Sequence, residues 1–155
     1  MRSSIRKSFT TLVLILGSLA LMALISGGVS SAIKVLPNPV LMITGTEYFE
    51  AGGKQFTRYK FSVENRAEYP DELFDPAPTL PPCGANTNSS RTWVDFYDSR
   101  GNRLYGFCAL KKNADLENIY FYLERDVLPP SFVYIELTDR KTNTKYKSKL
   151  AETTQ

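Results

Sequence analysis

The feature that most constrains this chain is an alternation of apolar and polar residues with a period of two beyond position 33. In "FTRYKFSV", Tyr59, Phe61 and Val63 alternate with polar residues, and "SFVYIEL" repeats the pattern further along. Successive side chains of a β-strand point to opposite faces, so this period indicates strands buried on one side. The apolar positions are also rich in aromatic and β-branched residues, which pleated sheets favour. The sequence therefore predicts an all-β fold.

The same pattern gives the layout of the predicted sheet strands. We expect about seven of them, at 40–44, 56–64, 91–97, 103–110, 119–124, 132–138 and 144–150. Hairpin turns are expected at "EAGGK", "DSRGN" and "DRKTN", and the glycine of "DSRGN" occupies a position that needs a positive φ. "KKNADLEN" predicts a single helical turn. Short strands separated by such turns favour an antiparallel β-sandwich.

The first 32 residues form a separate segment with a targeting signature. Arg2, Arg6 and Lys7 precede a long uncharged run, which ends in the small residues "SGGVSSA". This order of regions is typical of a secretory signal peptide. The alternative is an uncleaved anchor, with 9–33 as a hydrophobic transmembrane helix. In either case the positive start predicts that 33–155 is exported, to the periplasm or the extracellular space, and is membrane-anchored only if the segment is retained.

Charge and composition exclude several classes of function. The chain has 19 basic and 16 acidic residues, and because three of the basic ones lie in the leader, the remainder carries no net charge. This balance argues against nucleic acid as a partner. The chain contains no histidine, and it lacks the phosphate-loop, G-x-S-x-G and H-E-x-x-H motifs. We therefore expect no enzymatic activity.

The two cysteines predict one disulfide, between Cys83 and Cys108. Thiols of exported proteins oxidise and stay oxidised, and an even number of cysteines fits a structural bridge. A redox C-x-x-C motif, further zinc ligands and a histidine base for a nucleophilic cysteine are all missing from the sequence.

Residues 65–90 form a long loop, rich in proline, which has no strand pattern. Loops of this length in a compact domain are commonly functional, and the prolines favour an ordered one. Its acidic residues could bind Ca²⁺, although their spacing matches no calcium-binding motif; a solvated acidic loop is the alternative. The candidate ligands are Glu68, Asp71, Glu72 and Asp75. No other cofactor is indicated.

Aromatic residues at alternate strand positions are the second candidate site. If Val94 and Phe96 face the core, a row of rings faces outward, where it could stack on sugars or anchor a protein partner. These candidates are Trp93, Tyr97, Tyr120, Tyr122 and Tyr134. Three lysines on the last strand, Lys145, Lys147 and Lys149, could likewise meet an anionic polymer, or protect a sheet edge from pairing.

The residues from 38 to 150 resemble an immunoglobulin-like or fibronectin type III-like sandwich. The resemblance rests on "YKFSV", on Trp93 in "RTWVDFYD", and on the terminal hairpin "FVYIELTDRKTNTKYKSKL". It implies that Trp93 is the buried core tryptophan, which is an alternative to its outward placement. Cys83 departs from the usual pair between the sheets, because it precedes the tryptophan strand. The block containing the two cysteines is also similar to exported bacterial domains.

Together these features predict a non-catalytic exported binding module. We expect its partner to be a protein or a surface glycan, engaged through the long loop or an aromatic face. The alternative is a membrane-tethered structural subunit of an envelope complex, with 9–33 retained as a transmembrane helix.

Overall fold

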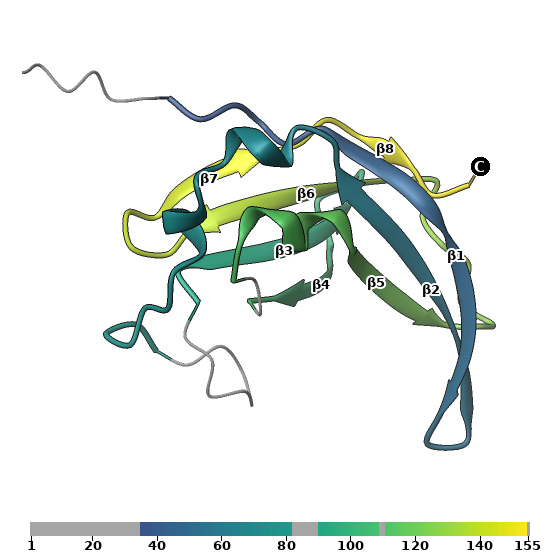
Figure 1. Ribbon diagram of the computed structural model, residues 1–155. Helices are drawn as coiled ribbons and strands as arrows, with labels where there is room; N and C mark the ends of the chain where they lie inside the picture. Colours follow the sequence, from purple (N-terminus) through teal and green to yellow (C-terminus); the bar gives the residue numbers. More distant parts are fainter. Residues whose placement is uncertain (1–34, 82–89, 109–110, 155) are drawn as a thin grey trace, which may run out of the picture. The chain divides into compact units, whose positions relative to one another are not determined.

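Two antiparallel sheets form the fold of the protein, as the sequence predicts. The computed structural model describes residues 35–81, 90–108 and 111–154, all of which belong to one unit, Val35–Gln155. The first sheet has the order β1-β2-β5, with β1 at Leu41–Ala51, β2 at Lys54–Val63 and β5 at Ile119–Glu124 (Figure 1).

The second sheet has the order β4-β3-β6-β7, and a short strand β8 also pairs with β6. Its strands are β3 at Thr92–Asp98, β4 at Arg103–Phe107, β6 at Phe132–Asp139, β7 at Thr144–Lys147 and β8 at Ala151–Glu152. All three expected hairpins are present. In the first, Gly52 and Gly53 have φ of 59° and 74° between the paired Ala51 and Lys54, the positive φ values of a type I′ turn.

Two expected strand boundaries are wrong, and each has a structural cause. β1 continues to Ala51 instead of ending at position 44, because a β-bulge between Ile43 and Gly45 changes which residues face inward. The last expected strand, 144–150, ends at Lys147, because the Ser148 hydroxyl donates to Lys149 O and accepts from the Ile135 amide; β8 begins only at Ala151. The described residues thus contain eight strands where the sequence predicted about seven.

The core lies between the two sheets and is built from the alternating residues that revealed the strands. Phe61 and Phe121 of the first sheet contact Phe96 of the second, with ring centroids 5.5 Å and 5.4 Å apart. All three side chains are fully buried. Replacing such a phenylalanine with alanine costs about 3–5 kcal/mol, so these contacts hold the layers together.

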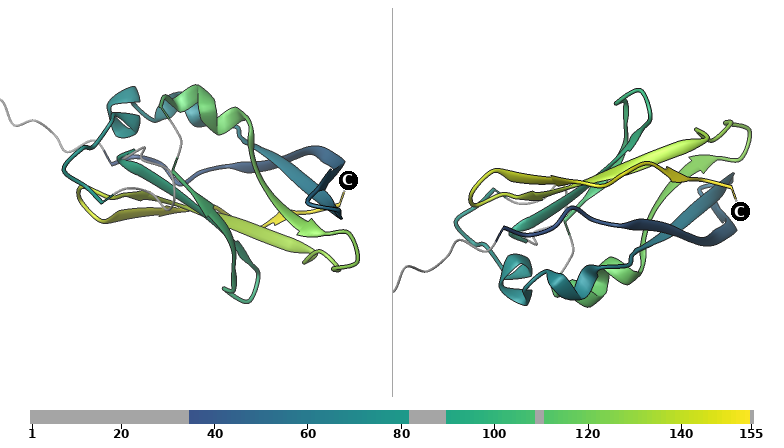
Figure 2. Two further views of the ribbon diagram at one scale, coloured as in Figure 1. Left: turned by 90° about the horizontal axis from the view of Figure 1, so that it is seen from below. Right: turned by 90° about the horizontal axis from the view of Figure 1, so that it is seen from above.

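The described part of the long loop supplies part of the core. It contains two 3-10 helices, η2 (Arg66–Glu68) and η3 (Asp71–Phe74). A third 3-10 helix, η4 (Asn113–Glu117), lies before β5 and confirms the expected helical turn. Figure 2 shows these helices close together on one side of the two sheets. Tyr69, Leu73 and Phe74 are buried, and the Tyr69 hydroxyl donates to Pro37 O at 2.6 Å.

A buried ion pair fixes the loop to the second sheet. The Arg91 guanidinium donates to both carboxylate oxygens of Asp139, at 2.8 Å and 2.6 Å, and also to Glu72 O. Burial would raise the pKa of Asp139, but hydrogen bonds from Arg91, Thr142 and the Lys141 amide outweigh it and lower the pKa from 3.8 to about 2. The carboxylate therefore stays ionised at every physiological pH.

Candidate functional site

The bulge in β1 determines which side chains the first hairpin presents on each side. Before the bulge, Ile43 pairs with the inward residue Phe61; after it, Thr46 pairs with the inward residue Tyr59. Odd-numbered residues face inward before the bulge and even-numbered ones after it. Gly45 has φ of 147°, a backbone conformation that side-chain-bearing residues rarely adopt. A glycine at this position therefore places Phe49 on the outer side of the hairpin and Tyr48 on the inner side.

Five aromatic rings form a continuous cluster on the outer side of the first sheet, which we call the aromatic face. Phe49 stacks on Phe56 with centroids 5.3 Å apart, and both rings meet the edge or face of Tyr122, at 5.9 Å and 5.6 Å. Tyr105, from the edge strand of the other sheet, lies 5.3 Å from Tyr122 and 6.4 Å from Tyr120. Tyr120 and Tyr122 are 36% and 39% exposed, so part of the cluster is open to solvent.

Arg58 lies within the aromatic face. Its guanidinium carbon is 4.7 Å from the ring centroids of both Phe49 and Tyr120, a position between two rings that cation–π attraction favours. Its Nε is buried without a hydrogen-bond partner among the described residues. Glu47 is its nearest acid, at 3.4 Å, and the same carboxylate oxygen lies 3.7 Å from Lys60. Two cations thus share one acid through long contacts, which leaves this face with a positive excess.

The outer side of the second sheet is organised differently, and we call it the ion-paired face. Asp95 and Glu136 lie opposite each other across β3 and β6, and each is neutralised, by Arg103 at 2.7 Å and by Lys145 at 2.6 Å. Rings lie among these pairs. Tyr97 stacks on Tyr134 with centroids 5.1 Å apart. Lys147 lies 3.9 Å from the Tyr134 ring centroid, and Arg103 lies 5.8 Å from that of Trp93.

The structure divides the predicted row of outward rings between these two faces. Trp93, Tyr97 and Tyr134 lie on the ion-paired face, whereas Tyr120 and Tyr122 lie on the aromatic face. The alternative that Trp93 is a core tryptophan is wrong: it is half-buried and points outward, because its neighbours Val94 and Phe96 occupy the core. Sequence reasoning missed Phe49, Phe56, Arg58 and Tyr105. The isolated glycine within a strand-like run was the available signal for the bulge that positions Phe49.

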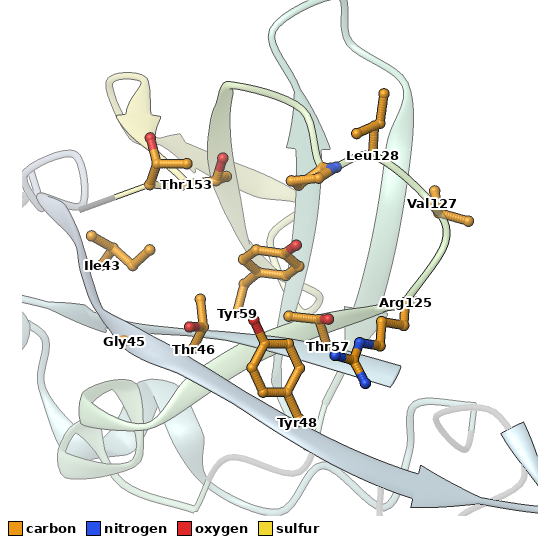
Figure 3. Close-up of a pocket in the computed structure, with 12 residues that line it drawn as sticks. Ile43, Gly45, Thr46, Tyr48, Thr57, Tyr59, Arg125, Val127, Leu128 and Thr153 are labelled. Carbon is orange, nitrogen blue, oxygen red and sulfur yellow. The ribbon is translucent and has the colours of Figure 1, made fainter. Parts of the chain in front are cut away.

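A cleft opens on the opposite, inner side of the β1–β2 hairpin (Figure 3). Its volume is about 470 Å³. Residues after β5 and near the C-terminus form the far wall. The lining residues are Ile43, Gly45, Thr46, Tyr48, Thr57, Tyr59, Arg125, Val127, Leu128, Pro129, Thr153 and Thr154.

The acidic residues of the long loop are not brought together. Asp71 accepts a hydrogen bond from the Asn113 amide, and across residues 35–81, 90–108 and 111–154 no group of three histidine, cysteine or acidic side chains is placed to hold a metal ion. The predicted disulfide remains a prediction, since Cys83 lies outside the described residues; Cys108 is buried. The expected leader also lies outside them.

Comparison with family models, with curated proteins and with solved structures found no significant match to this chain. Among the helices of the described part, none has the length and apolar character needed to cross a membrane.

Proposed function

We propose that this chain is an exported, non-catalytic binding module that docks a protein partner through the aromatic face. The observation that carries the proposal is the continuous cluster of partly exposed rings around Arg58, which spans both sheets. Tyrosine and arginine are enriched at protein interfaces, where a few such residues supply most of the binding energy.

A protein is a better partner for this face than a glycan because the faces of the rings are already covered. Phe49 has Phe56 stacked on it and Arg58 above it, and Arg58 also covers Tyr120. Sugars stack on free ring faces, and these contacts occupy several of them. An apolar protein surface can pack against the exposed part of Tyr120 and Tyr122 and bury it.

Charge adds a second property of the partner. Because Arg58 and Lys60 share the single carboxylate of Glu47, an acidic side chain on the partner would gain a nearby cation. Desolvating that contact strengthens it, as Coulomb attraction grows when water is excluded. The partner surface should therefore be apolar at its centre and acidic at one side.

Export and architecture are parts of the same proposal. The charged and hydrophobic leader and the cysteine pair support an oxidising destination outside the cytoplasm. The assignment of strands to the two sheets supports a fibronectin type III-like sandwich. β4 pairs with β3 and so joins the second sheet, while β5 joins β1 and β2 in the first.

Site-specific photocrosslinking locates the docking surface directly. A photoreactive phenylalanine analogue at position 122 should give a crosslinked adduct with one protein in cells that export the chain, and the same analogue at position 134, on the ion-paired face, should not. Mass spectrometry then identifies the partner, and the purified pair should reproduce the binding. An adduct formed at 134 and not at 122 would contradict the proposal.

A further inference from the structure

The cleft behind the β1–β2 hairpin has the size of a small-molecule site and an unusual number of hydroxyl groups. Its volume of about 470 Å³ lies within the range of about 300–1,000 Å³ typical of ligand pockets. The hydroxyl-bearing lining residues come from both strands of the hairpin and from the C-terminal segment: Thr46, Tyr48, Thr57, Tyr59, Thr153 and Thr154. This lining does not suit a purely apolar ligand.

Two of these hydroxyls belong to buried side chains that lack a protein partner. Tyr59 is 7% exposed and Thr57 is 8% exposed, and neither hydroxyl takes part in a hydrogen bond within the described part of the chain. Both hydroxyl oxygens nevertheless reach solvent. Among the described residues, the one side-chain nitrogen or oxygen that is fully buried without a hydrogen bond is Arg58 Nε. Both hydroxyls therefore open into the cleft, with Tyr59 in its centre (Figure 3). Because both hydroxyls reach the cleft and form no hydrogen bond within the described part of the chain, they are available to a ligand.

Arg125 is the one charged residue among those that line the cleft. It donates from Nη1 to Gln55 Oε1 at 3.0 Å, and its guanidinium carbon lies 5.1 Å from the centroid of the Tyr48 ring. No carboxylate of the described residues forms an ion pair with it, and its sequence neighbour Glu124 pairs with Lys54. The guanidinium can therefore receive a carboxylate in the fork geometry that arginine favours.

We propose that this cleft binds a hexuronate unit of an acidic polysaccharide, with its carboxylate on Arg125 and its hydroxyls on Tyr59 and Thr57. A hexuronate combines the three properties that the lining complements. It carries one carboxylate, several hydroxyls that both donate and accept, and an apolar ring face. The apolar part of the lining, Ile43, Val127 and Leu128, supplies the surface against which that face packs. The cleft lies on the inner side of the hairpin, although Arg125 and Tyr48 also border Phe49 and Phe56 of the aromatic face. The sugar-binding proposal uses neither ring and does not rest on the protein-binding proposal.

Isothermal titration of the full chain with digalacturonate, and with the neutral digalactoside as the matched ligand, tests the site. We expect saturable binding of the acidic disaccharide with a dissociation constant on the order of 1 mM, and binding of the neutral one about tenfold weaker. Raising the salt concentration should reduce the difference between the two ligands.

Variants then assign the contacts. Arg125→Gln should lower the affinity for digalacturonate about tenfold, to the level of the neutral sugar. Tyr59→Phe, which keeps the buried ring, should weaken both sugars about fivefold through loss of one hydrogen bond. Tyr134→Phe, on the ion-paired face, is the matched control and should bind like the unmodified chain. A circular dichroism melt of each variant verifies that it is folded.

Three results would overturn the proposal. The first is no saturable binding of either disaccharide. The second is equal affinity for the acidic and neutral sugars, or affinity that Arg125→Gln and Tyr59→Phe leave unchanged. The third is tighter binding of a short peptide with a leucine and a free C-terminal carboxylate, lost in Arg125→Gln, which would assign the cleft to a peptide end. None of these results bears on crosslinking at the aromatic face.

Discussion

The two outer faces of this sandwich carry similar residues but differ in how closely their acids and cations are paired. On the ion-paired face, Asp95 and Glu136 each have a cation within 2.7 Å, and Lys147 lies against Tyr134. On the aromatic face, the rings gather around Arg58, whose nearest acid is 3.4 Å away and is shared with Lys60. Two surfaces with similar residue types can thus differ in how far those residues satisfy one another, and the proposal of a docking surface rests on this difference.

The largest effect is expected where the second sheet is anchored by a buried charge. Asp139→Ala should lower the free energy of unfolding by about 3 kcal/mol, because it leaves the Arg91 guanidinium partly buried without its acid. Asp95→Ala, which opens the exposed pair with Arg103, should lower it by about 1 kcal/mol or less. Urea unfolding of both variants provides the comparison. Equal losses would mean that the ion-paired face is held together as firmly as the buried anchor.

The pH dependence of stability follows from the same carboxylate. Because the pKa of Asp139 is about 2 in the folded state and near 3.8 when exposed, its stabilisation is complete above pH 4 and is lost as the pH falls through 2. The loss should amount to about 2 kcal/mol. Urea unfolding between pH 5 and pH 2 measures it, and Asp139→Asn, which cannot titrate, should remove this part of the slope.

The bulge that builds the aromatic face should be the next most sensitive feature. Gly45→Ala forces a side chain into a backbone conformation with φ of 147°, at a cost of about 1–2 kcal/mol. An added Cβ would meet no neighbouring atom within 4 Å, so the loss reflects the backbone alone. A thermal melt measures the loss, and binding of the partner found by crosslinking should fall with it if the hairpin adopts another register.

The smallest expected effect comes from a glycine on the opposite face. A Cβ on Gly106 would clash with Arg103 Nη2 and Asp95 Oδ1, so Gly106→Ala must displace this exposed ion pair. Exposed pairs contribute little, and stability should fall by less than about 1 kcal/mol. Partner binding should not change, since the pair lies away from the aromatic face. A loss of binding in Gly106→Ala would show that the ion-paired face takes part.

The sequence predicts the fold well because period-two patterning records which side of a strand is buried. Val94, Phe96 and Ile135 face the core as the pattern indicates, and the three hairpin turns lie where the sequence predicts them, two of them at glycines. The limits of β1 could not be predicted in the same way. The bulge at Ile43–Gly45 exchanges inward and outward positions. A single alternating pattern therefore assigns the residues after the bulge to the wrong side of the strand.

The candidate site was predictable only in part, for a related reason. Alternation assigns Tyr120 and Tyr122 to an outer surface, but it does not tell which of the two sheets that surface belongs to. Strand pairing decides this: β5 joins β2, which places both tyrosines beside Phe56 and Arg58, far along the sequence. The contact between Tyr105 and Tyr122 joins the edges of different sheets and leaves no periodic signal.

The central claim, that the aromatic face is the docking surface, is tested most directly by the affinity of two variants for the protein crosslinked at position 122. Tyr122→Ala should weaken binding about 30-fold, as expected for an interfacial tyrosine that contributes about 2 kcal/mol, while Tyr134→Ala should bind within about twofold of the unmodified chain. Equal affinities for the two variants, or a larger loss in Tyr134→Ala, would contradict the account.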